Sequence, residues 1–349
     1  MAGFDRLTRR TLLGGAAATG AAATLGWGGP ALGQSPEAIK MSLEFRIYGG
    51  NAPMFLAAEN GVYDSQKLAV TPEGSAGSDE SIRRVAAGTH PFGLADATTL
   101  IAFAANNPAA APKLVMPIFD RFPACILSLK RKPVKSLADL KGITLGTGTS
   151  DAGSKIFPAL LALNNIDPAS FGRQTVDVKL RDAMLLAGKV DAVIAFDYTA
   201  IFNLIGNGVK LEDIELLYFS DFGFDFFGNS LIVNPEVLAR NPDLVRRVAI
   251  ATARAWTTAS KTRDAAIASV VRREKLLDAK VERARMDWVI DKLIRTDNVR
   301  KNGIGQADPA RIERAIGLIK TGFDLPTAPT VGQLFDPSFM PPAEDRNIG

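Results

Sequence analysis

The chain has 349 residues, with 41 basic and 37 acidic side chains, one histidine and one cysteine. A formal net charge of only +4 argues against a nucleic-acid-binding surface, and a lone cysteine, Cys125, excludes an internal disulfide. Because a single hydrophobic core stops growing beyond about 250–300 residues, the length predicts two domains or lobes.

The N-terminal segment 1–33 is typical of an export signal. Paired arginines at 9–10 precede a Gly/Ala/Leu stretch, which ends at Pro30 and is less apolar than the ~20 residues of a membrane span. We therefore expect a signal peptide of twin-arginine type, read by the twin-arginine export machinery and cleaved near Gly33/Gln34. Cleavage leaves a net charge of +2, and no cysteine lies near the cleavage site to carry a lipid anchor, which predicts a free monomer in the periplasm.

Short strands alternate with helices from Leu43 onward, and this alternation predicts an α/β fold with mixed, mainly parallel sheets. Each strand runs through a Gly, Asn or Asp turn into the next helix. The strands predicted for the first lobe are 43–48, 68–71, 92–95 and 113–118.

A second lobe follows without a disordered linker, so the chain is expected to pass between the lobes as strands. We predict the first crossing strand at 125–129 and the return crossing at 230–233. The strands of the second lobe are expected at 143–146, 176–180, 190–196 and 215–219. This divides the mature chain into lobe I, 34–128 plus 231–349, and lobe II, 129–230, with a hinge of two crossing strands.

The candidate ligand site lies at the turns that follow the strands, because open α/β sheets bind ligands beyond their carboxyl ends. Helix N-termini at such turns offer backbone N–H groups to an anion or a carbonyl, and nearby aromatic rings suit a flat ligand. The candidate ligand-binding residues are Asn51, Ala52, Ser78, Asp96, Ala97, Thr98, Asp120, Thr149, Ser150, Asp197, Phe222 and Asp225.

Several of these residues also have a purely structural interpretation. Ser78, Asp96 and Ser150 are good helix N-caps, and Asp197 follows an apolar strand, where a cap is also common. The aromatic segment 219–228 fits a ligand lid and a buried contact between lobes equally well.

The motifs of enzymes are incomplete. Gly146 and Gly148 lack the third glycine of a dinucleotide fingerprint, and the Asp-Phe-Gly at 221–223 lacks a catalytic-loop partner. With only His90 and Cys125, neither a zinc site nor a Cys–His pair is predicted. Paired carboxylates among the four candidate aspartates keep hydrolysis as an alternative, although no spacing singles out a pair. No metal and no cofactor is expected.

Five segments carry a pattern that recurs, in this order, in one known family. They are Asn51-Ala-Pro-Met-Phe-Leu-Ala-Ala-Glu-Asn-Gly-Val-Tyr63, Val85-Ala-Ala-Gly88 with Phe92-Gly-Leu-Ala-Asp96, Ser136-Leu-Ala-Asp-Leu-Lys-Gly142-Ile-Thr-Leu-Gly146, Leu186-Ala-Gly-Lys-Val-Asp-Ala192, and Val233-Asn-Pro-Glu-Val-Leu-Ala-Arg-Asn-Pro-Asp-Leu-Val245. The chain resembles the solute-binding family named for its similarity to thiamine-pyrimidine synthases, which includes receptors for taurine, alkanesulfonates, nitrate and thiamine pyrimidines.

That resemblance implies a type II periplasmic binding protein, whose lobes close on a small solute for delivery to an ABC permease at the inner membrane. It implies ligand contacts at the turns given above, from Asn51 to Asp197. Acidic side chains dominate these turns and Arg121 is the only evident cation, so a simple divalent oxyanion fits poorly. A pyrimidine or other small ring, or a taurine-like zwitterion, is the expected solute. The alternatives are a solute-sensing subunit and an exported enzyme on the same fold.

Overall fold

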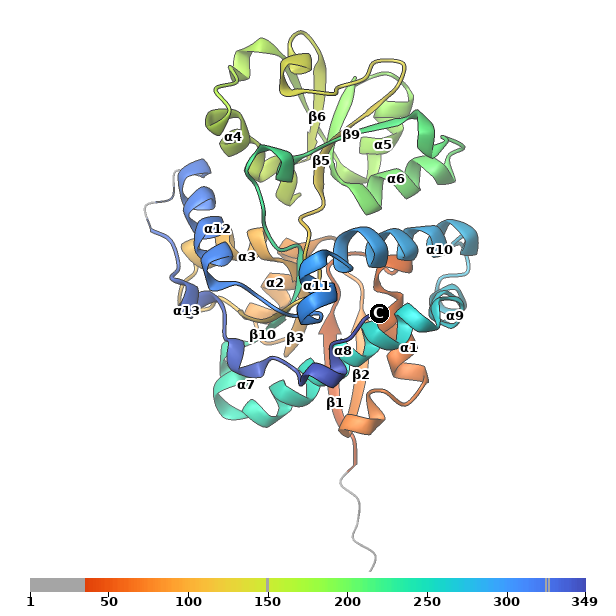
Figure 1. The fold of residues 1–349 in the computed structure, drawn as a ribbon, viewed down its shortest axis with the longest axis vertical. Helices are drawn as coiled ribbons and strands as arrows, with labels where there is room; N and C mark the ends of the chain where they lie inside the picture. Colours follow the sequence, from red (N-terminus) through yellow and green to blue (C-terminus); the bar gives the residue numbers. More distant parts are fainter. Residues whose placement is uncertain (1–34, 149–150, 324, 326) are drawn as a thin grey trace, which may run out of the picture. The chain divides into compact units, whose positions relative to one another are not determined.

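The computed structural model of the protein describes residues 35–148, 151–323, 325 and 327–349 (Figure 1). In this part of the chain two sheets of five strands form, with the orders β2-β1-β3-β10-β4 and β7-β6-β8-β5-β9. In each sheet parallel strands are joined by a long-range antiparallel strand, β10 in the first and β5 in the second. The predicted fold class, two lobes of mixed and mainly parallel sheet, is confirmed.

The first sheet combines strands from two separate stretches of the chain. Its strands are β1 (Glu37–Ser42), β2 (Leu68–Glu73), β3 (Phe92–Asp96), β4 (Lys113–Pro117) and β10 (Asn229–Val233). The helices associated with it are α1 (Ala52–Glu59), α2 (Ser78–Ala86), α3 (Ala97–Asn106), α7 (Pro235–Arg240), α8 (Pro242–Lys261), α9 (Arg263–Arg273), α10 (Ala279–Trp288), α11 (Asp297–Asn302), α12 (Pro309–Gly322) and α13 (Val331–Leu334). Both β3 and β10 are buried along their whole length, as central strands covered on two faces should be.

The second sheet is built from one continuous stretch of chain. Its strands are β5 (Ala124–Leu129), β6 (Thr144–Gly148), β7 (Gly172–Val176), β8 (Ala192–Phe196) and β9 (Ile214–Tyr218). Figure 1 shows α4 (Ala152–Leu163), α5 (Val178–Leu186) and α6 (Asp197–Gly206) gathered about this sheet. A strand was predicted at 176–180, but β7 ends at Val176, four residues earlier. The first turn of α5, which begins at Val178, takes the place of the rest of that strand.

The first strand also lies elsewhere than predicted. It pairs with β2 over Glu37–Ser42, whereas the segment 43–48 leaves the sheet and forms a loop. The alternation of Leu43, Phe45 and Ile47 imitates a half-buried strand. The loop itself is closed by Asn51, which accepts from the Tyr48 amide at 3.2 Å and donates to the Arg46 carbonyl at 3.0 Å.

The two passages between the sheets are not the predicted crossing strands. The segments 125–129 and 230–233 each pair within a single sheet, as parts of β5 and β10. The chain instead passes between the sheets through the irregular segments 118–123 and 219–228. Backbone hydrogen bonds join the two passages at the ends next to the first sheet, where the Gly228 amide donates to the Phe119 carbonyl at 2.9 Å. The sheets, not the crossings, hold the regular structure.

Helices that follow the return passage contact elements of the second sheet. α10 packs against α6, and α12 packs against α4. The second contact is very close, because a β-carbon added at Gly322 would lie 1.9 Å from Cβ of Ala159. No helix among the residues described is long and apolar enough to cross a bilayer.

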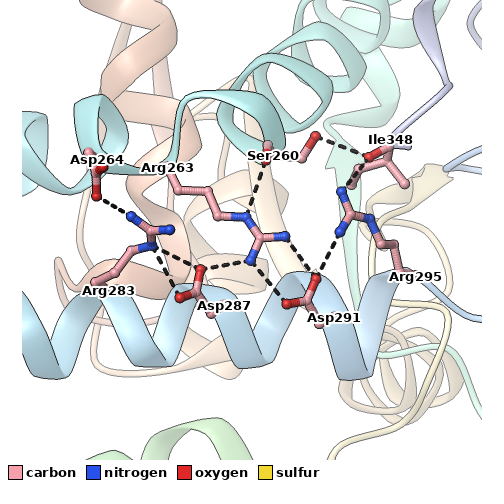
Figure 2. Close-up of polar contacts among 8 residues, drawn as sticks. All are labelled: Ser260, Arg263, Asp264, Arg283, Asp287, Asp291, Arg295 and Ile348. Atoms are coloured by element: carbon pink, nitrogen blue, oxygen red, sulfur yellow. Dashed lines mark hydrogen bonds and ion pairs between the residues drawn. The ribbon is translucent and has the colours of Figure 1, made fainter.

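A ladder of ion pairs joins α10 and the turn after it to the start of α9 (Figure 2). Arg263 donates to Asp287 at 2.7 Å and to Asp291 at 2.8 Å, which joins the start of α9 to α10 and to the turn after it. Arg295 links Asp291, at 3.0 Å, to the carbonyl of Ile348, at 2.9 Å. Its bonds to Arg263 lower the pKa of the Asp291 carboxyl. α10 also packs against α6 of the second sheet's helices.

Candidate functional site

A pocket of about 70 Å³, called here the cleft pocket, has walls from both sheets. Its lining residues are Glu44, Phe45, Ala76, Gly77, Ser78 and Thr99 around the first sheet, and Asp151, Ala152, Val178, Arg181, Phe196, Tyr198 and Thr199 around the second. For comparison, an apolar cavity of about 150 Å³ holds benzene. A ring-sized ligand therefore requires the two walls to move apart.

Glu44 supplies a buried carboxyl group to the first wall. Its Oε1 accepts from the Tyr48 hydroxyl at 2.7 Å, and only 4% of the residue is exposed. Its Oε2 has no hydrogen-bond partner among the described residues. Burial raises the pKa of this carboxyl above its ordinary value. The 43–51 loop, closed by Asn51, thus holds an incomplete acceptor at the pocket.

Asp151 supplies the corresponding group to the second wall. It caps α4, because its Oδ1 accepts from the Ser154 amide at 2.7 Å. Its Oδ2 is buried and has no partner within the part of the chain that the structure describes. The predicted site residues Thr149 and Ser150, which come directly before it, lie outside the described residues. Each wall therefore contains one buried carboxylate oxygen that has no hydrogen-bond partner among the described residues.

Arg181 is a cation in the second wall and is 3% exposed. Its Nε donates to Asp182 at 2.9 Å, and Nη1 reaches the carbonyl of Ile194 at 3.5 Å. Asp182 in turn accepts from Asn203 at 2.8 Å. The expectation that Arg121 is the only cation at the site is therefore wrong. Arg121 stacks over the ring of Tyr218 at 4.2 Å and is not part of the pocket lining.

Aromatic rings form the apolar part of the pocket. Phe196 stacks on Tyr198 with ring centroids 6.0 Å apart, and Tyr198 stacks on Tyr48 at 6.1 Å. The Tyr198 hydroxyl accepts from Asn229 of β10 at 3.3 Å, which ties the second wall to the first sheet. Phe45 closes the other side. Rings fixed in this way can contact a flat ligand over a large area without losing much side-chain freedom.

Asp96 lies behind the first wall. Its Oδ1 accepts from the amides of Thr98 and Thr99, at 2.9 and 3.1 Å, and its own amide donates to Ser78 Oγ at 3.0 Å. Ser78 and Thr99 line the pocket, whereas Asp96 is fully buried and does not. Burial raises the pKa of Asp96 to about 6. In this structure Asp96 positions two pocket residues.

Asp197 lies behind the second wall. Its Oδ2 accepts from Tyr218 Oη and from Trp288 Nε1 of α10, both at 2.9 Å, and its Oδ1 accepts from the Tyr198 amide at 2.5 Å. Burial raises its pKa to about 6. The Arg285 guanidinium reaches the Tyr198 carbonyl at 2.8 Å, so α10 is bonded twice to the start of α6. Asp197 thus positions Tyr198 and joins the two walls.

The remaining predicted residues lie at or beneath other surfaces. Ala52, Ala97 and Thr98 are buried in helix starts and do not line the pocket. Asp120 and Asp225 lie on the two passages between the sheets and share the partner Arg311. Phe222 ends a short 3₁₀ turn in the second passage. Of the predicted site residues that the structure describes, Ser78 alone lines the cleft pocket.

Sequence reasoning missed most of the lining. Glu44 and Phe45 were placed in a strand that is a loop. Arg181 could have been predicted as a site residue, because it directly follows the predicted strand 176–180. Thr99, Phe196 and Thr199 are each one or two residues from a predicted site residue. Among the described residues no group of three or more His, Cys, Asp or Glu side chains could hold a metal ion.

Comparisons with known proteins identify the family and the fold of the chain. The model of the family described as NMT1/THI5 like matches residues 50–266. The chain is 25% identical over 202 residues to the riboflavin-binding protein RibY of Chloroflexus aurantiacus, and the matched stretch covers 56% of this chain and 55% of RibY. It is 26% identical over 214 residues to a 4-amino-5-hydroxymethyl-2-methylpyrimidine phosphate synthase of Legionella pneumophila, covering 60% of this chain and 65% of that one. The chain thus spans less than two thirds of either relative.

Solved structures share the fold over a greater length. The alkanesulfonate-binding protein SsuA from Xanthomonas axonopodis pv. citri, bound to MOPS, is similar with a TM-score of 0.65 at 15% identity. The similarity covers 87% of this chain and 99% of that one. The fold is therefore that of the periplasmic binding proteins, and the resemblance seen in the sequence is confirmed. With the family model matching more than half of its length, the chain belongs to the NMT1/THI5-like family.

Proposed function

We propose that this protein is the solute-binding component of an ABC importer and captures a flat nitrogen heterocycle that carries N–H donors. The observation that carries the proposal is the pair of buried acceptors in the cleft pocket. Glu44 Oε2 comes from one wall and Asp151 Oδ2 from the other, and neither has a partner among the residues described. A solute that donates to both would join the walls.

The energetics favour a donor over an anion. A buried acceptor without a partner costs about 1–3 kcal/mol, which a ligand N–H group recovers. A sulfonate would instead face the two carboxyl groups, while the nearby Arg181 already pairs with Asp182. Phe45, with the other aromatic rings, suits the face of a ring. The names of the two relatives, for riboflavin and for an aminopyrimidine phosphate, also refer to nitrogen heterocycles.

Capture proceeds by lobe movement in this proposal. The 70 Å³ pocket is too small for a ring, so the solute enters while the walls are apart and stabilises the closed arrangement by contacting both. The segment 1–33 is the export signal of twin-arginine type, the mature monomer acts in the periplasm, and the solute passes to the permease unchanged. The lobes are the two sheets with their helices.

A binding screen of the chain from Gln34 tests the solute class. Calorimetric titrations use 4-amino-5-hydroxymethyl-2-methylpyrimidine, riboflavin and MOPS, each followed by a thermal-shift measurement. We expect a heterocycle to bind and to stabilise the protein by about 2.7 kcal/mol at 100 times its Kd. MOPS should give no heat. Binding of MOPS alone would overturn the proposal, and chemical conversion of a bound heterocycle, seen by chromatography, would favour the enzyme.

A matched pair of variants assigns the site. Glu44→Gln keeps the size of the side chain and removes its charge, whereas Glu313→Gln makes the same change on the exposed face of α12. Because hydrogen bonds to charged groups contribute about 1.5–3 kcal/mol, we expect Glu44→Gln to weaken heterocycle binding by roughly 10-fold to 100-fold. Glu313→Gln should bind like the unaltered protein. Equal affinities for both variants would remove Glu44 from the site.

A further inference from the structure

Arg311, near the start of α12, contacts both passages between the sheets. Its guanidinium donates to Asp120 Oδ1 at 3.0 Å and to the Asp120 carbonyl at 2.5 Å in the first passage. In the second passage it donates to Asp225 Oδ1 at 2.6 Å and to the Phe226 carbonyl at 2.9 Å. It also lies 4.1 Å from the ring centroid of Phe227. One side chain thus holds two segments that are about a hundred residues apart in sequence.

The same ends of the passages are bonded directly to each other. The Gly228 amide donates to the Phe119 carbonyl at 2.9 Å, and the amides of Ile118 and Phe119 both donate to the Asn229 carbonyl at 2.9 Å. We call residues 118–121 and 225–229, with Arg311, the hinge block. Its members are connected to one another and to the first sheet through β4 and β10.

The carboxyl group of Asp120 has a partner on each of its oxygens within the hinge block and its surroundings. Besides Arg311, it accepts from Asn298 at 2.9 Å and from Thr296. The next amide, of Arg121, donates to the Leu293 carbonyl at 3.0 Å. The first passage is therefore anchored to the chain after α10 as well as to α12. A carboxyl group whose two oxygens both have protein partners is suited to holding segments of the chain together, and not to binding a ligand.

Among the described residues, the parts of the passages nearer the second sheet make no hydrogen bond to Arg311, although Phe122 and Phe224 pack against Phe226 of the hinge block. These parts comprise residues 122–123 and 219–224, and the second of these contains Gly223 with φ of 93°, a conformation that glycine adopts without strain. Lobe movements are absorbed by a few residues in such connecting segments. We therefore expect bending in the half of each passage that lies beyond the hinge block.

We propose that Arg311 is the positioning residue of the hinge, which fuses the two passages into one block and so fixes the axis about which the lobes move. A guanidinium suits this position because its planar fork offers five donors in fixed directions. A lysine ammonium keeps the charge but serves both passages poorly. The inference goes beyond the proposed function and holds for whichever solute the cleft pocket takes.

The test measures the lobe arrangement without any solute. Spin labels are attached at Lys141→Cys and Ala239→Cys, two exposed positions around different sheets, while the native Cys125 is buried. Pulsed electron–electron double resonance then gives the distribution of the distance between the labels. We expect Arg311→Ala to widen this distribution by roughly twofold, because the passages then bend along their whole length. The control Arg314→Ala, on the exposed face of the same helix, should leave it unchanged.

Two milder variants separate hinge control from loss of folding. Asp225→Asn, at a side chain that is 65% exposed, removes one charged contact to the second passage and should widen the distribution less than Arg311→Ala. Arg311→Lys should widen it nearly as much as Arg311→Ala, because charge without the fork is insufficient. An unchanged distribution in a folded Arg311→Ala protein, or full recovery with lysine, would overturn the inference. Neither outcome depends on the solute, so the proposed function is tested separately.

Discussion

The cleft pocket and the hinge block both bring polar side chains of distant segments together, yet they differ in how complete their hydrogen bonding is. In the pocket, Glu44 and Asp151 each keep a buried oxygen without a partner among the described residues. In the hinge block, Asp120 is bonded through both oxygens and Arg311 through several nitrogens. Since proteins satisfy nearly all buried polar groups, the incomplete region is the one suited to a ligand. The hinge block, in which the hydrogen bonding is complete, is suited to a structural role.

The largest expected effect comes from a substitution in the hinge block, where the hydrogen bonding is complete. Asp120→Ala leaves the mostly buried Arg311 without its main counter-charge, which should lower the free energy of unfolding by about 3–5 kcal/mol. Urea denaturation followed by circular dichroism measures this loss. Asp221→Ala, at an exposed position of the second passage, is the matched control and should change little. A loss for Asp120→Ala no greater than that of the control would contradict the distinction between the two regions.

A second prediction concerns the buried carboxyls behind the pocket walls. Burial raises the pKa of Asp197 from 3.8 to about 6. The folded chain therefore binds this proton more tightly than the unfolded chain. The resulting contribution to stability is fully present below pH 4 and is lost as the pH rises to 6, at a cost of roughly 3 kcal/mol. Asp96 behaves in the same way.

The variant Asp197→Asn isolates that contribution from those of other acids. Its free energy of unfolding, measured by urea denaturation from pH 4 to pH 7, should increase relative to that of the unaltered protein as the pH rises. Asp243→Asn, at an exposed carboxylate on α8, provides the matched comparison. A difference between Asp197→Asn and the unaltered protein that stays constant across this range would show that Asp197 titrates normally.

A smaller effect is expected from Asp151→Asn, which keeps the oxygen that caps α4. We expect heterocycle affinity to fall about 3-fold to 10-fold, near the value of one ordinary hydrogen bond, with little change in melting temperature. Calorimetric titration and a thermal melt measure the two quantities. Asp167→Asn, at another N-cap on an exposed turn, should leave the affinity intact. A large drop in melting temperature with unchanged affinity would place Asp151 with the complete, structural groups.

The smallest effect belongs to the rim of the pocket. Arg46 donates to Asn203 at 3.1 Å across the two walls, in an exposed position. Exposed polar contacts of this kind contribute about 0–1 kcal/mol, so Arg46→Ala should change affinity less than about 5-fold. The same titration detects it. An effect as large as that of Glu44→Gln would mean that the rim, and not the buried pair, carries recognition.

The sequence was sufficient for the two-lobed architecture because alternation of strands and helices is a local pattern. It predicted the position of several turns, including Ser78 at the start of α2. It failed for Glu44, because Leu43, Phe45 and Ile47 alternate as a strand does although the paired strand lies just before them. It also grouped Asp120 with the ligand contacts. The ion pair of Asp120 with Arg311, which is distant in sequence, becomes visible only in the fold and is the basis of the hinge role proposed for it.

The close contact between α12 and α4 leaves no room for a side chain at residue 322. A methyl group added to Gly322 would overlap the β-carbon of Ala159, so a larger residue there would push the two helices apart. If the lobes move as we propose, the helix that begins in the hinge block meets α4 at its other end, and the size of residue 322 would then limit how closely the two helices approach.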